Sequence, residues 1–427
     1  MKRKIIQQLK LWKDNPARKP LILLGARQVG KTWVMKHFGL TEFENVAYIN
    51  CDVEPLAKEL FAADYNIPRI LLALQAITGT KIEAGKTLIV FDELQEVERG
   101  LHSLKYFQEN APEYHVMAAG SLLGITLGKG QSFPVGKVNV MHLYPMDFEE
   151  FLMAAGETDL CDLLHQPDWE ILKILSLKYI DLLRQYYYVG GMPEVVDCFF
   201  QHQNLQEVRD KQTEILDAYR RDISKHTTPT ESMRIGQVLQ SLPSQLAKEN
   251  KKFIYNVLKK GARSTEYELA IQWLMDAGLV HKVSRVKELQ MPVKFYEDLG
   301  AFKLFLLDCG LLGCMTEAPA SQMLVGDNVF KEFKGAFTEQ FVAQGFSPYY
   351  WSSDKTPAEI DFVVQTEHRV IPVEVKAEEN VRARSMSEYI KNHPDYQLRG
   401  LRISMMGYQD QEWMENIPLF AITKFFG

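Results

Sequence analysis

The sequence predicts an α/β protein of several domains, and three features of the chain indicate this architecture. Short apolar runs such as "LILL" (residues 21–24) and "LIVF" (residues 88–91) alternate with segments whose apolar residues recur at helical spacing. The chain has 427 residues, more than the ~100–200 of one compact domain. Near the carboxyl end, several carboxylates and a lysine lie on short apolar segments, which favours a second α/β domain there.

Composition indicates a protein of the reducing cytoplasm. The five cysteines are scattered, without a CxxC pair or a Cys/His cluster at zinc spacing: Cys51, Cys161, Cys198, Cys309 and Cys314. No window approaches the ~18 apolar residues of a membrane span, and the start of the chain does not resemble a signal peptide. The net charge of −6 excludes a broadly basic surface but leaves room for a local basic face.

Residues 1–18 predict an amphipathic, basic helix. Ile5, Ile6, Leu9 and Trp12 recur at helical spacing among lysines and arginines. A helix docked on the next domain is the favoured interpretation, and an arm that binds nucleic acid or a membrane surface is the alternative.

The segment "GARQVGKT" (residues 25–32) fits the pattern G-x-x-x-x-G-K-[ST], between an apolar strand and a helix. Its glycines let successive N–H groups point at one anion, and the next helix adds its positive end. We therefore expect a P-loop core over residues 19–152 that binds ATP. The nucleotide would contact Gly25, Ala26, Arg27, Gln28, Val29, Gly30, Lys31, Thr32 and Trp33, with the Lys31 ammonium on the β and γ phosphates and the Thr32 hydroxyl on Mg²⁺.

A second apolar strand ends in Asp92 and Glu93, where a P-loop fold places acidic residues. Asp92 is expected to hold Mg²⁺ through water and, like Lys31, to belong to the nucleotide site. Glu93 is expected to be the general base that deprotonates the attacking water. The alternative, that this acidic pair only caps a helix, loses weight because Lys31 precedes it.

A third strand, "YHVMAAGSLLG" (residues 114–124), ends at Ser121. The hydroxyl of Ser121 is a candidate for contact with the γ phosphate or the attacking water. Capping of the next helix explains it equally well.

Together, "GARQVGKT", "FDELQ" and "AAGSLLG" resemble the AAA-type ATPases of bacteria and archaea that are fused to a carboxy-terminal domain of unknown function. The likeness continues through residues 138–152, which close the ATPase core in that family, and residues 186–196, which open a helical segment. The resemblance implies a prokaryotic protein with an AAA-type core and a helical lid over residues 153–230.

Such ATPases often use an arginine on the transferring phosphoryl group. The candidates are Arg27 and the pair Arg220 and Arg221, although surface salt bridges explain them too. Lys137 stands where the family usually has arginine. Lysine lacks the planar guanidinium group that binds two phosphate oxygens at once, so an arginine-like role at this position is in doubt.

Residues 231–290 predict short helices followed by a two-stranded wing, which together indicate a winged helix. The presumptive recognition helix, residues 264–278, has acidic residues and no lysine or arginine, which argues against sequence readout of DNA. Basic residues beside it would instead hold a phosphate backbone: Lys251, Lys252, Lys259, Lys260 and Arg263. Residues 291–330 are expected to form a connector.

In residues 331–427, Glu339 falls on an expected helix, Asp361 on a strand, and Glu374 and Lys376 on one face of the next strand. Three carboxylates suit a second Mg²⁺ or a Mn²⁺, and Lys376 would position the nucleophile or stabilise the leaving oxygen. This order resembles the PD-(D/E)XK nuclease fold of restriction enzymes, which implies a restriction-endonuclease-like α/β domain. Ordinary polar alternation on a strand pair is the alternative. Arg382 and Arg384 follow as candidate backbone contacts, although a solvated helix start explains them equally well.

Two hypotheses follow. The first is a Mg²⁺-dependent ATPase whose nucleotide state controls a nuclease-like or DNA-binding module. The second is a slow nucleotide-dependent switch whose nuclease-like fold is inactive and binds protein or nucleic acid. Both leave a protein partner and a homo-oligomer open, and neither involves a membrane.

Overall fold

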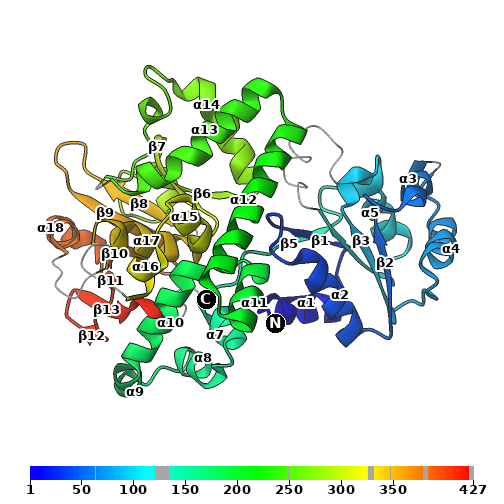
Figure 1. Cartoon of the computed structure of the whole chain (residues 1–427), viewed down its shortest axis with the longest axis horizontal. Coiled ribbons are helices and arrows are strands. Elements are labelled where there is room, and N and C mark those ends of the chain that lie inside the picture. The colour runs from blue at the N-terminus through cyan, green and yellow to red at the C-terminus, as the bar shows by residue number, and fades with distance from the viewer. Residues whose placement is uncertain are drawn as a thin grey trace. The chain divides into compact units, whose positions relative to one another are not determined.

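The computed structural model describes residues 1–62, 64–120, 134–248, 250–325, 331–346, 348–377 and 383–422 (Figure 1). The chain divides into two compact units. The first comprises residues 1–144 with 276–278, and the second comprises residues 145–275 with 279–427.

The first unit is built on a parallel sheet of five strands in the order β2-β3-β4-β1-β5. This arrangement confirms the predicted parallel α/β fold. The strands are β1 (Leu21–Leu24), β2 (Asn45–Asn50), β3 (Thr87–Asp92), β4 (His115–Ala119) and β5 (Asn139–His142). The connecting helices are α1 (Ile5–Asp14), α2 (Lys31–Glu42), α3 (Pro55–Ala62), α4 (Ile67–Thr78) and α5 (Gly100–Asn110), with a 3-10 turn η1 (Leu94–Glu96).

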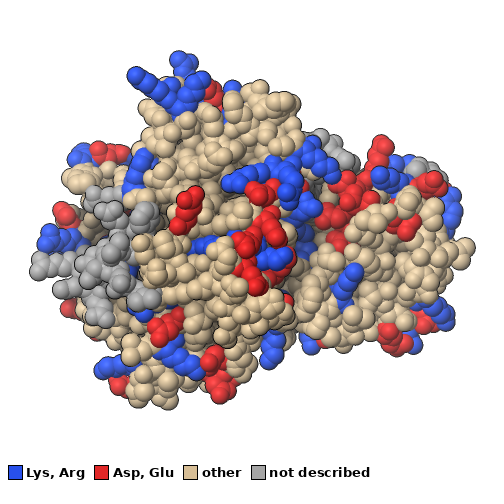
Figure 2. Space-filling view, viewed as in Figure 1, with Lys and Arg blue, Asp and Glu red and all other residues tan. Residues whose placement is uncertain are grey.

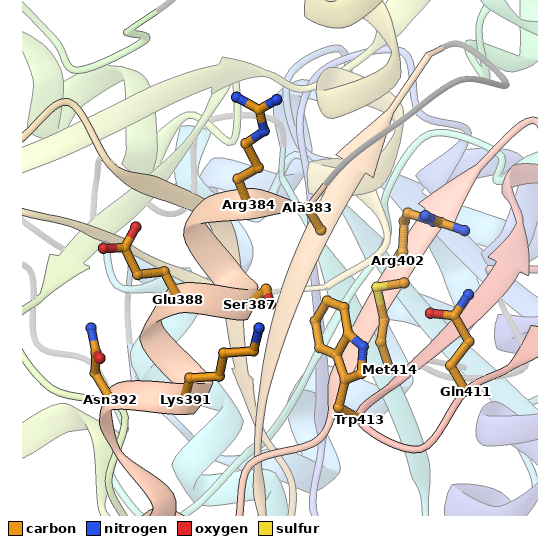
Figure 3. A pocket seen from close by; sticks show the side chains of 10 residues that line it. All are labelled: Ala383, Arg384, Ser387, Glu388, Lys391, Asn392, Arg402, Gln411, Trp413 and Met414. Atoms are coloured by element: carbon orange, nitrogen blue, oxygen red, sulfur yellow. The ribbon is translucent and has the colours of Figure 1, made fainter.

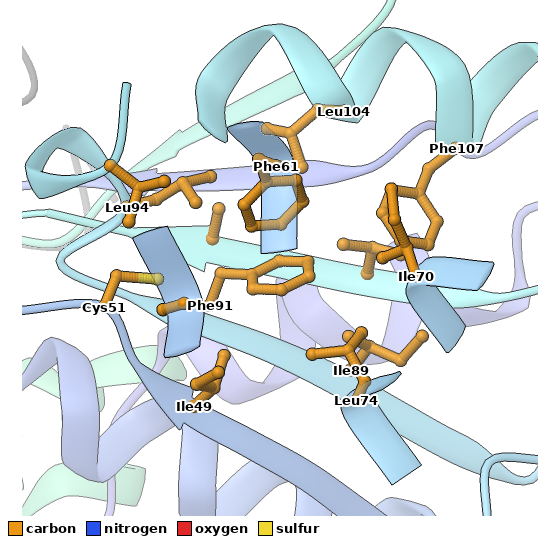
Figure 4. Packing of buried hydrophobic residues seen from close by; sticks show 14 of the residues in the cluster. Ile49, Cys51, Phe61, Ile70, Leu74, Ile89, Phe91, Leu94, Leu104 and Phe107 are labelled. Carbon is orange, nitrogen blue, oxygen red and sulfur yellow. The ribbon is translucent and has the colours of Figure 1, made fainter. Parts of the chain in front are cut away.

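Both faces of this sheet are covered, as a parallel sheet requires. Ile89 and Phe91 of β3 pack with Phe61 of α3, Ile70 of α4 and Phe107 of α5 in one buried cluster (Figure 4). The alternate residues of β3 face α2, which α1 covers in turn. Helix α1 buries Ile5, Leu9 and Trp12, so it is docked and not a free arm.

The second unit begins with helices. They are α7 (Phe148–Ala154), α8 (Thr158–His165), α9 (Trp169–Ile174), α10 (Ser176–Val189), α11 (Pro193–His202), α12 (Leu205–His226), α13 (Pro229–Leu246) and α14 (Ser264–Asp276), with η2 (Tyr255–Val257). The aromatic residues of α10 form core: Tyr179 and Tyr186 are fully buried, and the Tyr186 hydroxyl donates to the carbonyl of Met146 at 2.7 Å. Helix α13 begins with a capping box in which Thr228 and Glu231 satisfy each other's backbone N–H groups.

A mixed sheet of eight strands follows, in the order β12-β13-β11-β10-β9-β8-β6-β7. The strands are β6 (Val280–Val286), β7 (Glu297–Leu306), β8 (Tyr349–Ser352), β9 (Glu359–Gln365), β10 (Val370–Lys376), β11 (Gly400–Ser404), β12 (Gln409–Asp410) and β13 (Met414–Pro418). Between and after them lie α15 (Cys309–Met315), α16 (Ala320–Val325), α17 (Lys331–Gln344) and α18 (Arg384–Asn392), and the 3-10 turns η3 (Val293–Tyr296), η5 (Pro394–Tyr396) and η6 (Leu419–Ala421).

The expected wing is part of this sheet. Strands β6 and β7 form an antiparallel pair, but β6 also pairs in parallel with β8. Residues 301–306 of β7 are all buried, which a solvent-exposed wing would not show. A separate winged helix is therefore not confirmed, and the boundaries expected within residues 231–427 remain predictions.

No helix in the described part of the chain is long and apolar enough to cross a membrane.

Candidate functional site

The loop between β1 and α2 has the backbone that the P-loop pattern predicts. Gly25 has a φ of 155°, and a Cβ atom there would lie 2.2 Å from the carbonyl oxygen of Leu143. Gly30, the N-cap of α2, has a φ of 92° in the left-handed region. Gln28 also adopts a positive φ of 66°. Glycine at residue 25 is thus required by close packing, and glycine at residue 30 by conformation.

Lys31 is folded onto this loop. Its Nζ atom donates to the carbonyl oxygens of Gly25 at 2.8 Å and Ala26 at 2.7 Å. Burial lowers the pKa of Lys31 to about 8, and the negative charges of Glu93 and Asp92 offset part of that effect. An incoming phosphate would supply a stronger partner for this ammonium than two neutral carbonyls.

Asp92, at the end of β3, lies beside the first turn of α2. Its Oδ2 atom accepts hydrogen bonds from the Thr32 hydroxyl at 2.6 Å and from the Tyr48 hydroxyl at 3.0 Å. The two residues expected to hold Mg²⁺ are thus in direct contact. Tyr48, on the neighbouring strand β2, was not among the predicted site residues. Burial and the Asp92 charge raise the pKa of its hydroxyl.

Glu93 follows Asp92 with a left-handed backbone, φ 52°. Its Oε2 atom accepts a hydrogen bond from the Gln95 side chain at 2.5 Å. After burial, the charge of Glu93 has the largest effect on the pKa of Lys31, which it raises. Gln95 is a second residue that the sequence analysis did not single out, although it ends the quoted "FDELQ" segment.

The other residues predicted in this unit lie on its surface, form other contacts or fall outside the described residues. Trp33 is exposed and stacks on His37 with ring centroids 4.5 Å apart. Arg27 lies on the loop surface, where its charge contributes to lowering the pKa of Lys31. Lys137 forms an ion pair with Glu109 at 2.8 Å. Ser121 falls in residues 121–133, outside the described part of the chain.

In the second unit, Arg220 forms an exposed ion pair with Asp217 at 2.7 Å. Arg221 is also exposed on α12.

The second unit brings together the four residues predicted near the carboxyl end. Strands β9 and β10 are antiparallel neighbours, and the backbone N–H of Val375 donates to Oδ2 of Asp361 at 2.8 Å. Lys376 Nζ lies 2.6 Å from Glu374 Oε1. Glu339, on α17, is close enough for its charge to act on both Asp361 and Glu374.

Two further lysines belong to this cluster. Lys303, on β7, is fully buried, with its Nζ atom 2.5 Å from Glu359 Oε1 and 3.7 Å from Glu339 Oε2. Lys251 Nζ lies 2.7 Å from Glu339 Oε1. The expectation that Lys251 holds a phosphate backbone is therefore wrong, because this side chain is buried and paired. The sequence does contain a signal for Lys303, because a single lysine within the apolar run "AFKLFLL" (residues 301–307) indicates a buried lysine that needs a partner.

Burial and mutual repulsion separate the pKa values of the carboxylates. Burial, together with the charges of Glu339 and Glu374, raises the pKa of Asp361 to about 8. Burial also raises the pKa of Glu374, against the opposing effect of Lys376. Burial disfavours the charged form of Glu339 as well, but Lys251 and Lys303 outweigh it and hold that pKa below its usual range. A cation bound nearby would therefore favour the charged forms of Asp361 and Glu374.

The donor set fits a hard divalent cation at Asp361 and Glu374. Oε2 of Glu374 is buried and has no hydrogen-bond partner among the described residues, and carboxylate oxygens are the ligands that Mg²⁺ and Mn²⁺ prefer. Glu339 fits less well, because Lys251 and Lys303 already neutralise it. Among the described residues, Glu339, Asp361 and Glu374 do not bring their ligand atoms within 4.8 Å of one another, whereas two other groups do.

Basic residues also line a cavity of about 560 Å³ on the same sheet, between α18 and the strands β11 and β13. Figure 3 shows Arg384 and Lys391 of α18 on one side and Arg402 and Trp413 on the other. Arg384 is one of the two predicted backbone contacts. The other, Arg382, lies in residues 378–382, outside the described residues.

Basic side chains also gather over the loop between α13 and α14 (Figure 2). Lys252, Lys259, Lys260 and Arg263 are exposed there. Helix α14 itself presents no lysine or arginine.

Residues 17–152 match the model of a family described as an AAA domain. Most of the first unit is therefore similar to AAA domains. Residues 180–322 match a domain of unknown function (DUF8612), and residues 334–425 match a second domain of unknown function (DUF4143). No curated protein sequence matches the chain.

Among solved structures, the chain is similar to the ORC2 protein of Aeropyrum pernix. The structure titled as its ADPNP-ADP complexes has 11% sequence identity and a TM-score of 0.35, with 80% of this chain and 95% of that chain covered. Its ADP form has 11% identity and a TM-score of 0.30, with 79% and 94% covered.

Proposed function

We propose that this protein is a Mg²⁺-dependent ATPase whose nucleotide state controls its carboxy-terminal module. The proposed ATPase activity rests on the convergence of Lys31, Thr32 and Asp92. Thr32 Oγ1 lies 2.6 Å from Asp92 Oδ2, and Lys31 Nζ donates to a carbonyl oxygen of the loop. This set of a buried lysine, a hydroxyl and a carboxylate at the carboxyl end of a parallel sheet suits a nucleoside triphosphate.

The residues of this site would have separate roles in ATP hydrolysis. Backbone N–H groups of residues 25–32 and the Lys31 ammonium bind the phosphates and neutralise charge as it develops on the γ phosphoryl group. When bound, Mg²⁺ would be held by Thr32 and Asp92 and would neutralise the β and γ oxygens. Glu93 orients the attacking water and accepts its proton, and the hydrogen bond from Gln95 fixes the Glu93 carboxylate.

The carboxy-terminal module is proposed to cleave a phosphodiester backbone. Asp361 and Glu374 would hold Mg²⁺ or Mn²⁺, which supplies an activated water and charge stabilisation. Lys376, 2.6 Å from Glu374, would position that water or steady the leaving oxygen, which takes up a proton as the phosphorus–oxygen bond breaks. Arg384 and the basic residues around the cavity next to α18 would contact the nucleic-acid backbone without reading its sequence.

One observation favours a second candidate function, a nucleotide-dependent switch with an inactive nuclease-like fold. Three lysines face the four carboxylates of the cluster, and Glu339 is neutralised by Lys251 and Lys303. Such a network can serve stability alone. In that case the module would bind protein or nucleic acid without cleaving it.

Glu93→Gln is expected to keep ATP binding and to lower the rate of hydrolysis by about 10²–10⁴-fold, because the amide cannot accept the proton of the attacking water. Phosphate release at saturating ATP, together with the affinity for a labelled ATP analogue, measures the two effects separately. Glu98→Gln, at an exposed glutamate five residues on, is the matched control and should hydrolyse ATP at the wild-type rate. An unchanged rate in Glu93→Gln would remove Glu93 as the base.

A further inference from the structure

A cysteine, a histidine and a glutamate meet where α11 ends and α12 begins. Cys198 and His202 are four residues apart on α11 and share one face of the helix, and Glu207 lies in the first turn of α12. Their ligand atoms all lie within 4.8 Å of one another. The sequence analysis missed this group because the third member, Glu207, comes close only through the turn between the helices.

The separations of these atoms are close to those of a metal site. Cys198 Sγ lies 4.0 Å from His202 Nδ1 and 3.9 Å from Glu207 Oε2. Tetrahedral Zn²⁺ with bond lengths of about 2.1–2.3 Å places its ligand atoms roughly 3.4–3.8 Å apart. The third separation, His202 Nδ1 to Glu207 Oε2, is 2.6 Å, the length of a hydrogen bond that a metal would replace.

The carboxylate is oriented by a neighbour. Asn204 Nδ2 donates to Glu207 Oε1 at 2.9 Å, which leaves Oε2 directed at Cys198 and His202. Asn204 also caps α12 through the N–H groups of Gln206 and Glu207. A hydrogen bond that fixes a ligating side chain in this way is typical of metal sites.

The surroundings are acidic and open. A cavity of about 380 Å³ adjoins the three residues, and four more carboxylates line it: Glu194, Asp197, Asp210 and Glu214. The opposing charge is Lys211, which is itself paired with Glu194 at 3.0 Å and Glu214 at 2.9 Å. The cavity leaves room for a water as the fourth ligand and attracts cations.

We propose that Cys198, His202 and Glu207 bind Zn²⁺, which joins the end of α11 to the start of α12. A thiolate, an imidazole and one carboxylate suit Zn²⁺ and not Mg²⁺, so this site is chemically distinct from the P-loop and from the carboxylates around Asp361. On binding, the metal displaces the proton of the Cys198 thiol and the proton shared by His202 and Glu207, and both protons pass to solvent. The proposal does not depend on ATP hydrolysis or on nucleic-acid cleavage.

A second group, Glu149, Cys161 and His165, also brings its ligand atoms within 4.8 Å. It repeats the four-residue Cys-to-His spacing on α8, with His165 Nε2 3.7 Å from Glu149 Oε2. Glu149 and Cys161 are both buried, however, whereas Cys198 and Glu207 line an open cavity. This group is the reference against which the proposal is tested.

Titration of the full chain with Co²⁺, without nucleotide, tests the site, because cysteine-bound Co²⁺ gives a thiolate charge-transfer absorption that oxygen ligands do not give. We expect one equivalent of cysteine-bound Co²⁺ that Zn²⁺ displaces. We expect the absorption to be lost in Cys198→Ser, and the Zn²⁺ affinity to fall at least about tenfold in His202→Ala and Glu207→Gln.

Two controls make the outcome specific. Cys314→Ser changes a cysteine of similar burial elsewhere in the unit and should leave the absorption unchanged, and so should Cys161→Ser. Absorption that persists in Cys198→Ser, or that disappears only in Cys161→Ser, would overturn the proposal. So would the absence of any cysteine-bound Co²⁺ in the wild-type protein.

Discussion

Lys31→Ala is expected to abolish ATP binding, with an affinity for a labelled ATP analogue lower by on the order of 10²–10⁴-fold. The Lys31 ammonium is buried, whereas Arg27 of the same loop is exposed. Each charge-assisted hydrogen bond that the ammonium makes to a phosphate is worth about 1.5–3 kcal/mol. Two such bonds account for the expected range. Lys31 is buried, so its position is fixed by the loop, and no surface lysine can replace it.

Loss of folding must be separated from loss of the phosphate contact. Lys31→Met keeps the volume of the buried side chain and removes only the charge, so it should bind ATP as poorly as Lys31→Ala. Lys86→Ala, at an exposed lysine before β3, is the control and should bind normally. Wild-type affinity in either Lys31 variant would refute the P-loop assignment.

The second large effect is expected on stability. Lys303→Met should lower the free energy of unfolding of the second unit by about 3–5 kcal/mol, because it leaves buried carboxylates without their partner. Lys303 Nζ lies 2.5 Å from Glu359 Oε1 and 3.7 Å from Glu339 Oε2, inside the sheet. The midpoint of urea unfolding, followed by the fluorescence of Trp351 and Trp413 in this region, measures the change.

The difference in the free energy of unfolding between wild type and Lys303→Met should depend on pH. The pKa of Glu339 is held below its usual range, so the stability that this carboxylate contributes is present at neutral pH and is lost as pH falls through the lowered value. The pKa of Lys303 is raised, so its ammonium stays charged throughout. The difference in the free energy of unfolding between wild type and Lys303→Met should therefore be largest at neutral pH and decrease below about pH 4. Exposed Lys287→Met is the control, with an effect within about 0.5 kcal/mol; an equal effect of both substitutions would contradict this role of Lys303.

The sequence was sufficient for the P-loop domain because its signals are local. Gly25, Gly30, Lys31 and Thr32 follow one another on a single turn whose backbone they determine, and Asp92 ends a strand that belongs to the same parallel sheet. Tyr48 could not be predicted, because its contact with Asp92 depends on which strand lies beside β3.

The second unit shows where sequence patterns are ambiguous. The segments of β6 and β7 read as a hairpin, and a hairpin pattern is the same for a wing as for the edge of a larger sheet. Pairing with β8 joins residues about 65 apart in the chain, such as Arg285 and Tyr350, and no local pattern encodes it. Glu374 and Lys376 were predictable from strand alternation, but Lys251 and Lys303 join them only through tertiary contacts.

In the function that we propose, one chain couples ATP to a metal-dependent module that acts on nucleic acid. The most direct measurement incubates the full chain with linear DNA, circular DNA or RNA in Mg²⁺ or Mn²⁺, with and without ATP, beside Lys376→Ala. We expect cleavage that changes with ATP and disappears in Lys376→Ala. Absence of cleavage on every substrate while ATP is still hydrolysed, or cleavage that persists unchanged in Lys376→Ala, would contradict it.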